Sequence, residues 1–308
     1  MRILIVGAGS VGGYFGGRLA EAGRDVTFLV RPARAEQLRR DGLRIKSPHG
    51  DAVLAPRLVL TGAKGSPFDL ILLSVKAYSL DTAAADFAPA VGPQTVILPL
   101  LNGLRHLDRL AKRFGEEAVI GGVCQVIAEV DRDGSIVQMA DLQRLSYGER
   151  GRESTARIRA IDEVLRGAGF DTVLSPDILQ AMWEKWVQLS SLGALTCLMR
   201  ATVGGVAAVP GGEELARALL AECVAVATAS GHPPSAELVS RHGAALTEKG
   251  SPATSSMYRD LRKGAPVEVD HILGDLLQRG VGEGVATPLL NAAFINLRIY
   301  QAGLTKRA

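Results

Sequence analysis

Residues 2–30 read RILIVGAGSVGGYFGGRLAEAGRDVTFLV, two short apolar runs separated by a glycine-rich turn and a helical stretch. The apolar runs, residues 2–6 and 25–30, are rich in β-branched residues and do not alternate, which is typical of strands buried on both faces of a sheet. The stretch between them predicts a helix from residue 11 to residue 22, with Gly23 as its C-cap. Together these features predict a strand–helix–strand unit, the building block of an α/β fold.

Three further apolar runs predict strands of the same sheet, with helical segments between several of them. They lie at residues 67–75, 95–102 and 118–130. Strands that alternate with helices form parallel sheets covered by helices on both faces. We therefore predict a doubly wound parallel sheet of the Rossmann type.

The pattern changes past about residue 150, where helical stretches replace strands. One more strand is expected at residues 170–175, followed by helices at residues 177–200, 212–230, 235–248, 268–281 and 287–302. Several prolines lie at or near the starts of these helices, where their missing N–H is tolerated. We place the boundary at Pro176 and predict an α/β domain at residues 1–176 and an all-helical domain at residues 177–308.

The composition excludes several classes of protein. Lys and Arg number 35 against 32 Asp and Glu, so no strong basic field points to a nucleic acid or a membrane as partner. The three cysteines have neither a paired zinc spacing nor a disulfide framework, which is typical of a reducing cytosol. No apolar run reaches the roughly 18 residues of a membrane span. We expect a soluble, cytoplasmic protein with a small-molecule substrate and no metal.

The glycine-rich turn carries the first functional signal. Gly7, Gly9 and Gly12 form the pattern G-x-G-x-x-G between the first strand and the first helix. In a dinucleotide site these glycines permit a tight turn, backbone approach to a pyrophosphate, and close packing of helix and strand. The alternative is a glycine-rich turn without a ligand. The predicted cofactor-binding residues of this loop are Gly7, Ala8, Gly9, Ser10, Val11 and Gly12.

An arginine follows the second strand, where NAD-binding folds carry an acidic residue. An acid there accepts hydrogen bonds from the ribose hydroxyls of NAD and repels a 2′-phosphate, whereas a guanidinium can hold a phosphate through two parallel bonds. Arg31, with Arg34 three residues on, therefore favours NADP; the alternative is a solvated surface arginine. Lys76 follows the strand LILLSV at the carboxyl edge of the sheet, either near the adenosine phosphates or simply exposed.

Five blocks in order resemble the ketopantoate reductase (2-dehydropantoate 2-reductase) family. They are GAGSVGGYFGGRLAEAG, SVKAYS around Lys76, LPLLNGL around Asn102, WEKWVQLSSL around Lys185, and SSMYRDLRKGAPVEVDHI near the C-terminus. The resemblance implies a Rossmann-type domain joined to a helical domain of the 6-phosphogluconate dehydrogenase C-terminal type. It also implies the NADPH-dependent reduction of 2-dehydropantoate to pantoate in pantothenate biosynthesis.

The resemblance assigns roles to four residues. Lys185 matches the family's catalytic lysine, a general acid toward the carbonyl oxygen; the alternative is a lysine that snorkels between two tryptophans. Asn102 matches an asparagine that faces nicotinamide and substrate, although Asn-Gly is also a turn signal. Ser256 matches a contact to the substrate carboxylate, and Glu268 matches a residue that binds the substrate hydroxyl and the cofactor and joins the lysine's hydrogen bonds. The alternatives are a helix cap at Ser255 or Ser256 and a first-turn acid at Glu268.

Two positions depart from the family on the helix that carries Lys185. Family members have asparagines one and two turns beyond the lysine, where this chain has Leu189 and Gly193. A pocket that hydrogen-bonds a hydroxyl selects for it, so apolar replacements can admit a different keto acid. The predicted substrate stays 2-dehydropantoate, with another 2-keto acid or carbonyl compound as the alternative. A sensor of NADPH without catalysis is a third interpretation, and a homodimer is left open.

Overall fold

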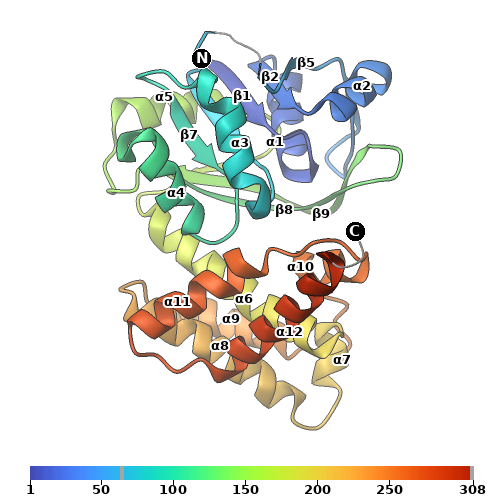
Figure 1. Cartoon of the computed structure of the whole chain (residues 1–308), viewed down its shortest axis with the longest axis vertical. Helices are drawn as coiled ribbons and strands as arrows, with labels where there is room; N and C mark the ends of the chain where they lie inside the picture. The colour runs from blue at the N-terminus through green and yellow to red at the C-terminus, as the bar shows by residue number, and fades with distance from the viewer. Residues whose placement is uncertain (63–65, 306–308) are drawn as a thin grey trace. The chain divides into compact units, whose positions relative to one another are not determined.

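The computed structural model describes residues 1–62 and 66–305. The chain separates into two compact units, Met1–Leu101 with His106–Leu179, and Asn102–Arg105 with Gln180–Ala308. The first unit is α/β and the second is all-helical (Figure 1), so the predicted fold class is confirmed. The assignment of cofactor binding to residues 1–176 and of catalysis to residues 177–308 stays a prediction.

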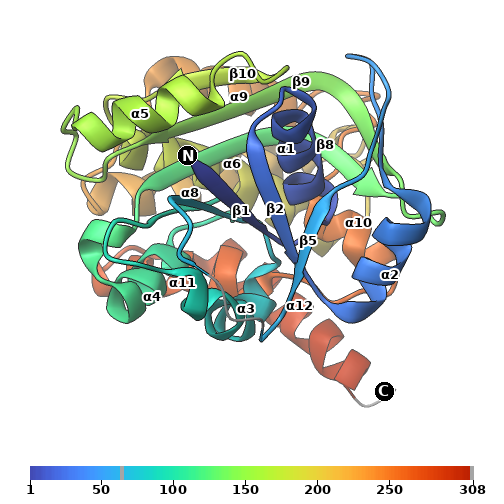
Figure 2. The ribbon, with the colours of Figure 1, turned by 90° about the horizontal axis from the view of Figure 1, so that it is seen from above.

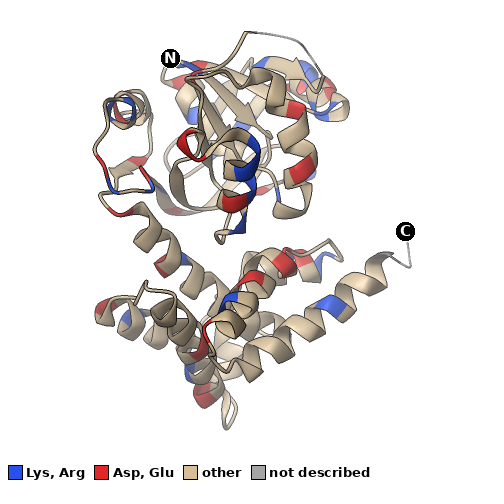
Figure 3. Cartoon of the chain, turned by 60° about the vertical axis from the view of Figure 1, so that its left-hand side comes forward, with Lys and Arg blue, Asp and Glu red and all other residues tan. Residues whose placement is uncertain are grey.

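Basic and acidic residues are mixed along the helices of each unit (Figure 3), in keeping with the nearly balanced charge of the sequence. Within the part of the chain that the structure describes, no helix combines the length and the apolar character that a membrane crossing requires.

Five parallel strands form the sheet that holds the glycine loop. They are β1 (Arg2–Val6), β2 (Asp25–Val30), β5 (Arg57–Leu60), β6 (Leu70–Leu73) and β7 (Val96–Pro99). Their order is β5-β2-β1-β6-β7. All four residues of β6 and all but the first of β1 are buried, as the apolar runs predict. Because β1, β2 and β6 are adjacent and parallel, the loops that follow them lie at one edge of the sheet.

The helices of this unit are α1 (Ser10–Glu21), α2 (Pro32–Asp41), α3 (Leu80–Phe87), α4 (Arg105–Phe114) and α5 (Ala156–Leu165), with short 3₁₀ turns η1 (Ala77–Ser79), η2 (Ala88–Ala90) and η3 (Glu116–Ala118). The first four follow β1, β2, β6 and β7 along the chain, whereas the fifth, α5, does not connect strands of this sheet. Helix α1 ends one residue earlier than predicted, and Gly23 follows its C-cap with a φ of +74°. A glycine tolerates this left-handed conformation without a steric cost, which is why it ends the helix.

A second sheet, which the sequence did not predict, also belongs to the first unit. Its strands are β3 (Leu43–Lys46), β4 (Ala52–Leu54), β8 (Gly121–Val130), β9 (Ile136–Gly148) and β10 (Asp171–Leu174). Their order is β10-β9-β3-β4, and β8 pairs with β9.

The prediction that residues 118–130 form a parallel strand of the first sheet is wrong. Strand β8 runs antiparallel to β9 within the second sheet. The segment forms a bridge to the first sheet at Val119 and Ile97, and it packs against β7 at Gly122, where a Cβ would lie 2.5 Å from Leu98 Cδ1. It then enters the hairpin. Asp133-Gly134 is the turn signal between two strands that distinguishes a hairpin from a single parallel strand.

Helix α1 lies between the two sheets (Figure 2), and glycines on two of its faces permit this. A Cβ at Gly16 would lie 2.7 Å from Ile5 Cγ1 and 2.8 Å from Phe28 Cε1 in the first sheet. A Cβ at Gly17 would lie 2.6 Å from Ile45 Cδ1 in the second sheet. The pattern GGYFGG therefore lets both sheets approach the helix backbone, and it fixes the place of the glycine loop that precedes the helix.

The second unit consists of helices. They are α6 (Ile178–Met199), which begins two residues before this unit, α7 (Val203–Ala207), α8 (Gly212–Ala229), α9 (Ala236–Leu246), α10 (Ser256–Arg262), α11 (Asp275–Gly282), preceded by the π-helical turn η4 (Asp270–Gly274), and α12 (Pro288–Thr305). The five predicted helices are confirmed as α6, α8, α9, the pair η4 and α11, and α12. The short helix α7 was not predicted.

Candidate active site

The glycine loop packs against the residue that follows β6. A Cβ at Gly12 would lie 1.9 Å from Ser74 Oγ and 2.2 Å from Gly7 O, so only glycine fits there. Ser74 Oγ lies 3.0 Å from the carbonyl oxygens of both Val6 and Gly7 and donates to this pair. The sequence prediction omitted Ser74, whose signal is a hydroxyl directly after a buried strand at the carboxyl edge of the sheet.

The open side of the loop lies at Gly9. This residue is the N-cap of α1, where no side chain caps the helix, and a Cβ there would meet no atom within 4 Å. The first N–H groups of a helix have no partner within the helix and carry partial positive charge, which favours an anion. The cradle at Gly12 and the open backbone at Gly9 fit the pyrophosphate of a dinucleotide.

The two arginines after β2 differ in their surroundings. Arg31 is exposed and is the N-cap of α2, with φ of −72° and ψ of 155°. Arg34 is part-buried, and its Nε donates to the Ala8 carbonyl of the glycine loop at 3.2 Å. Burial lowers the pKa of Arg34, although a guanidinium stays charged at any physiological pH. Arg31 is therefore the arginine that faces outward next to the glycine loop, as a ligand of a 2′-phosphate must.

Lys76 lies at the same edge of the sheet. It follows β6 as the N-cap residue of η1, it is exposed, and its carbonyl accepts from Ser79 N at 2.9 Å. The loops that start at Gly7, Arg31 and Lys76 follow three adjacent parallel strands. The first unit thus brings together the cofactor-binding residues predicted for it.

Lys185 lies on α6 beside two anchored tryptophans. Trp183 and Trp186 are 3% and 0% exposed, and their ring centroids lie 5.0 Å apart. The guanidinium carbon of Arg279 lies 5.6 Å from both centroids. Trp186 Nε1 donates to Ile272 O at 2.9 Å. Because its neighbours are fixed in the core, the part-buried Lys185 occupies a fixed place on the helix.

The segment before α11 joins this neighbourhood. The Glu268 carbonyl accepts from Ile272 N at 3.0 Å, and Ile272 in turn accepts from Trp186. Residues 102–105 belong to the same compact unit, where a Cβ at Gly103 would lie 3.1 Å from His271 O. These contacts join the segments that carry Asn102, Lys185 and Glu268.

Ser256 is the first residue of α10, and its neighbour Ser255 is the cap. Ser255 Oγ accepts from Tyr258 N at 3.0 Å and lies 2.9 Å from Thr196 Oγ1 on α6. Since Ser255 caps the helix, the part-buried Ser256 is the serine whose hydroxyl the cap does not use. Its predicted role toward the substrate carboxylate stays a prediction.

At Gly193, where the family has an asparagine on this helix, the structure has an apolar neighbour. A Cβ at Gly193 would lie 2.9 Å from Met257 Cε, so a methionine side chain fills the place beside this glycine. The serines of the helix are already used: Ser190 Oγ lies 3.5 Å from Ile272 O, and Ser191 donates to Val187 O at 2.8 Å. Ser190 and Ser191 therefore do not take the place of the family's asparagine at position 193. Among the described residues, no group of three or more His, Cys, Asp or Glu could hold a metal ion.

Comparison with known proteins agrees with this arrangement. The profile of ketopantoate reductase PanE/ApbA matches residues 3–152, and that of its C-terminal part matches residues 177–301. The uncharacterized oxidoreductase YkpB of Bacillus subtilis is 36% identical over 98% of this chain and 99% of its own. The crystal structure of 2-dehydropantoate 2-reductase from Geobacter metallireducens has a TM-score of 0.89 at 30% identity, over 97% and 99% of the two chains. A D-mandelate dehydrogenase with NADH and anilino(oxo)acetate has the same fold, with a TM-score of 0.89 at 22% identity over 99% and 100% of the chains.

A parallel sheet with a glycine loop, followed by an all-helical unit, defines a dinucleotide-binding oxidoreductase of the two-unit type. Within this class, the chain belongs to the ketopantoate reductase family.

Proposed function

We propose that this protein reduces 2-dehydropantoate to pantoate with NADPH, in pantothenate biosynthesis, with Lys185 as the general acid. One observation carries the cofactor choice: the exposed Arg31 directly follows β2, where an acid would repel a 2′-phosphate. The family match over both units supports the reaction type. The cytoplasm as the site of this reaction stays part of the proposal.

The chain's own residues divide the work of the reaction. When bound, the reduced nicotinamide supplies a hydride to C2 of the keto acid. Negative charge then develops on the carbonyl oxygen, and Lys185 stabilises it and donates a proton from Nζ. The Ser256 hydroxyl donates to the substrate carboxylate, and Glu268 accepts from the substrate hydroxyl and orients the lysine. Asn102 orients the nicotinamide and the carbonyl group.

The second candidate is a reductase of a different 2-keto acid with the same machinery. Leu189 and the Gly193–Met257 contact favour it, because apolar groups stand where the family places amides. A pocket of this kind accepts an apolar substituent better than a hydroxyl. The name D-mandelate dehydrogenase describes a 2-hydroxy acid with an aromatic substituent as the substrate of a protein with this fold.

A panel of 2-keto acids separates these candidates. The purified protein is mixed with NADPH, and the loss of the cofactor's absorbance is followed with 2-dehydropantoate and with apolar branched and aromatic 2-keto acids. We expect kcat/KM for 2-dehydropantoate to exceed the others by at least about tenfold, the value of one hydrogen bond to the hydroxyl. A higher kcat/KM for an apolar keto acid establishes the second candidate.

NADPH binding without turnover of any keto acid would instead indicate a sensor. Size-exclusion chromatography with light scattering on the same preparation tests the homodimer, which stays a prediction.

A further inference from the structure

Arg34 joins three segments that are far apart in the sequence. Its Nε donates to Ala8 O of the glycine loop at 3.2 Å. Its Nη1 donates to Gln37 Oε1 at 2.6 Å and to Gly134 O at 3.2 Å. The remaining nitrogen, Nη2, is buried. The guanidinium therefore points inward, between the glycine loop, α2 and the turn of the β8–β9 hairpin, and not toward a ligand in solvent.

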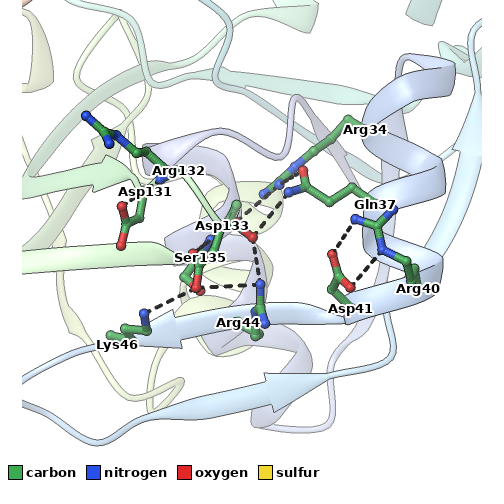
Figure 4. Close-up of polar contacts among 11 residues, drawn as sticks. Arg34, Gln37, Arg40, Asp41, Arg44, Lys46, Asp131, Arg132, Asp133 and Ser135 are labelled. Atoms are coloured by element: carbon green, nitrogen blue, oxygen red, sulfur yellow. Dashed lines mark hydrogen bonds and ion pairs between the residues drawn. The ribbon is translucent and has the colours of Figure 1, made fainter.

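The turn of this hairpin, residues 131–135, is itself fixed from two elements; we call it the hairpin tip. Gln37 Nε2 of α2 donates to Asp133 O at 3.3 Å, and Arg44 Nη2 of β3 donates to the same carbonyl at 2.6 Å. Lys46 Nζ lies 3.4 Å from Asp133 Oδ2. Figure 4 shows these side chains converging on Asp133 from both elements. The hairpin tip is thus a firm support for Arg34.

The contact to Ala8 O has a consequence for the next N–H group. A carbonyl and the following N–H belong to one planar peptide and point in opposite directions. The hydrogen bond from Arg34 holds the Ala8 carbonyl on the side of α2, so the N–H of Gly9 points away from it. Gly9 is the position where the loop opens, since a Cβ there would meet no atom within 4 Å.

We propose that Arg34 is a positioning residue of the nucleotide site. The hairpin tip holds the guanidinium, and the guanidinium holds the Ala8–Gly9 peptide in the orientation that offers its N–H to the pyrophosphate. This inference rests on the proposed function, because it needs a dinucleotide in the glycine loop. Since NADPH and NADH share the pyrophosphate, Arg34 supports both, whereas Arg31 distinguishes them.

Binding measurements on three single variants test this role. Dissociation constants for NADPH and NADH are measured by titration calorimetry for the wild type, Arg34→Gln, Gly134→Ala and Arg31→Gln. We expect Arg34→Gln to weaken both nucleotides about tenfold and to leave their ratio within about twofold. Gly134→Ala should also weaken both nucleotides, although Gly134 is not part of the glycine loop. Gly134 has a φ of +81° and a Cβ there would lie 1.9 Å from Gln37 Nε2, so the substitution displaces the hairpin tip that holds Arg34. Arg31→Gln, the matched control, weakens NADPH alone.

The other outcomes each overturn the proposal or its basis. A selective loss of NADPH affinity in Arg34→Gln would make Arg34 a ligand of the 2′-phosphate. Unchanged affinities, with or without a lower melting temperature of the nucleotide-free protein, would leave Arg34 with a structural role only. If the wild type binds neither nucleotide, the proposed function fails and the positioning role fails with it.

Discussion

The glycine loop and the surroundings of Lys185 differ in the kind of atoms that define their shape. Around the loop, backbone atoms and glycines without a Cβ define the site: Gly12 touches Ser74 and Gly7 so closely that no other residue fits. Along α6, side chains define the site, and Met257 occupies space beside Gly193. A site made of backbone tolerates no substitution, while a site made of side chains can change its ligand. The geometry of the glycine loop therefore restricts its residues more strictly than the surroundings of Lys185 restrict the side chains of α6.

The largest effect is expected at Lys185. Lys185→Ala removes the proposed general acid, so kcat should fall by roughly 10² to 10⁴-fold while the dissociation constant for NADPH stays unchanged. Steady-state kinetics and calorimetry measure the two quantities. Lys185→Arg keeps the charge and is the control for a merely electrostatic role. Turnover of Lys185→Ala close to that of the wild type would remove the lysine from the mechanism.

Two glycine substitutions test whether backbone atoms, and not side chains, define the site at the glycine loop. Gly12→Ala places a Cβ 2.2 Å from a backbone oxygen, so we expect a loss of about 3 kcal/mol in unfolding free energy together with lost nucleotide binding. Gly9→Ala meets no atom, so stability should change by less than about 0.5 kcal/mol while the pyrophosphate is blocked. Urea denaturation and nucleotide titration distinguish the two. Equal stability of both variants would contradict the packing described for the loop.

Because side chains define the proposed substrate site along α6, one substitution there should increase selectivity for 2-dehydropantoate. Gly193→Asn displaces only the flexible end of Met257, and the new amide can hydrogen-bond a hydroxyl. The ratio of kcat/KM for 2-dehydropantoate to that for an apolar 2-keto acid should rise about tenfold, with unchanged affinity for NADPH. Gly193→Ala, which adds bulk without an amide, is the control. A similar ratio in both variants would show that this position does not face the substrate.

The smallest expected effect is a loss of unfolding free energy at acidic pH. Ser191 Oγ on α6 lies 2.9 Å from Nε2 of His242 on α9, and burial lowers the pKa of His242 to about 4. The unfolded chain takes up this proton near pH 6.5 and the folded chain only near pH 4, so stability is complete above about pH 6.5 and falls as the pH falls toward 4.

When the pH is lowered from 7 to 5.5, His242 should reduce the free energy of unfolding by about 1 kcal/mol. Urea denaturation at both pH values measures the loss, and His242→Gln should reduce it by that amount. An identical pH dependence in the variant would exclude His242 as the cause. Arg34, which joins separate segments of the first unit, stays charged over this pH range, so it should not contribute to the loss.

The sequence predicted β1, β2, β6 and β7 of the first sheet and most of the helical unit, because these elements have clear apolar runs or helical periodicity. It did not predict the edge strand β5. It predicted β10 of the second sheet but missed β3 and β4, which have four and three residues and are too short for a periodic signal. It assigned residues 118–130 to the wrong sheet because the Asp133-Gly134 turn that follows them was not recognised as a hairpin turn. The loop Gly7–Gly12 was predictable, since its chemistry lies in consecutive residues. The inward direction of Arg34 was not, because its partners Ala8 and Gly134 come from segments whose meeting only the tertiary fold determines.

In the proposed function, Arg31 beside the glycine loop selects NADPH over NADH. The ratio of kcat/KM for NADPH to that for NADH, measured with one 2-keto acid in the wild type and in Arg31→Gln, tests it most directly. We predict a wild-type ratio above about 10, which the variant reduces to near 1, because a guanidinium bond to a phosphate contributes about 1.5 to 3 kcal/mol. A wild-type ratio of 1 or less, or a ratio that Arg31→Gln leaves unchanged, would contradict the claim.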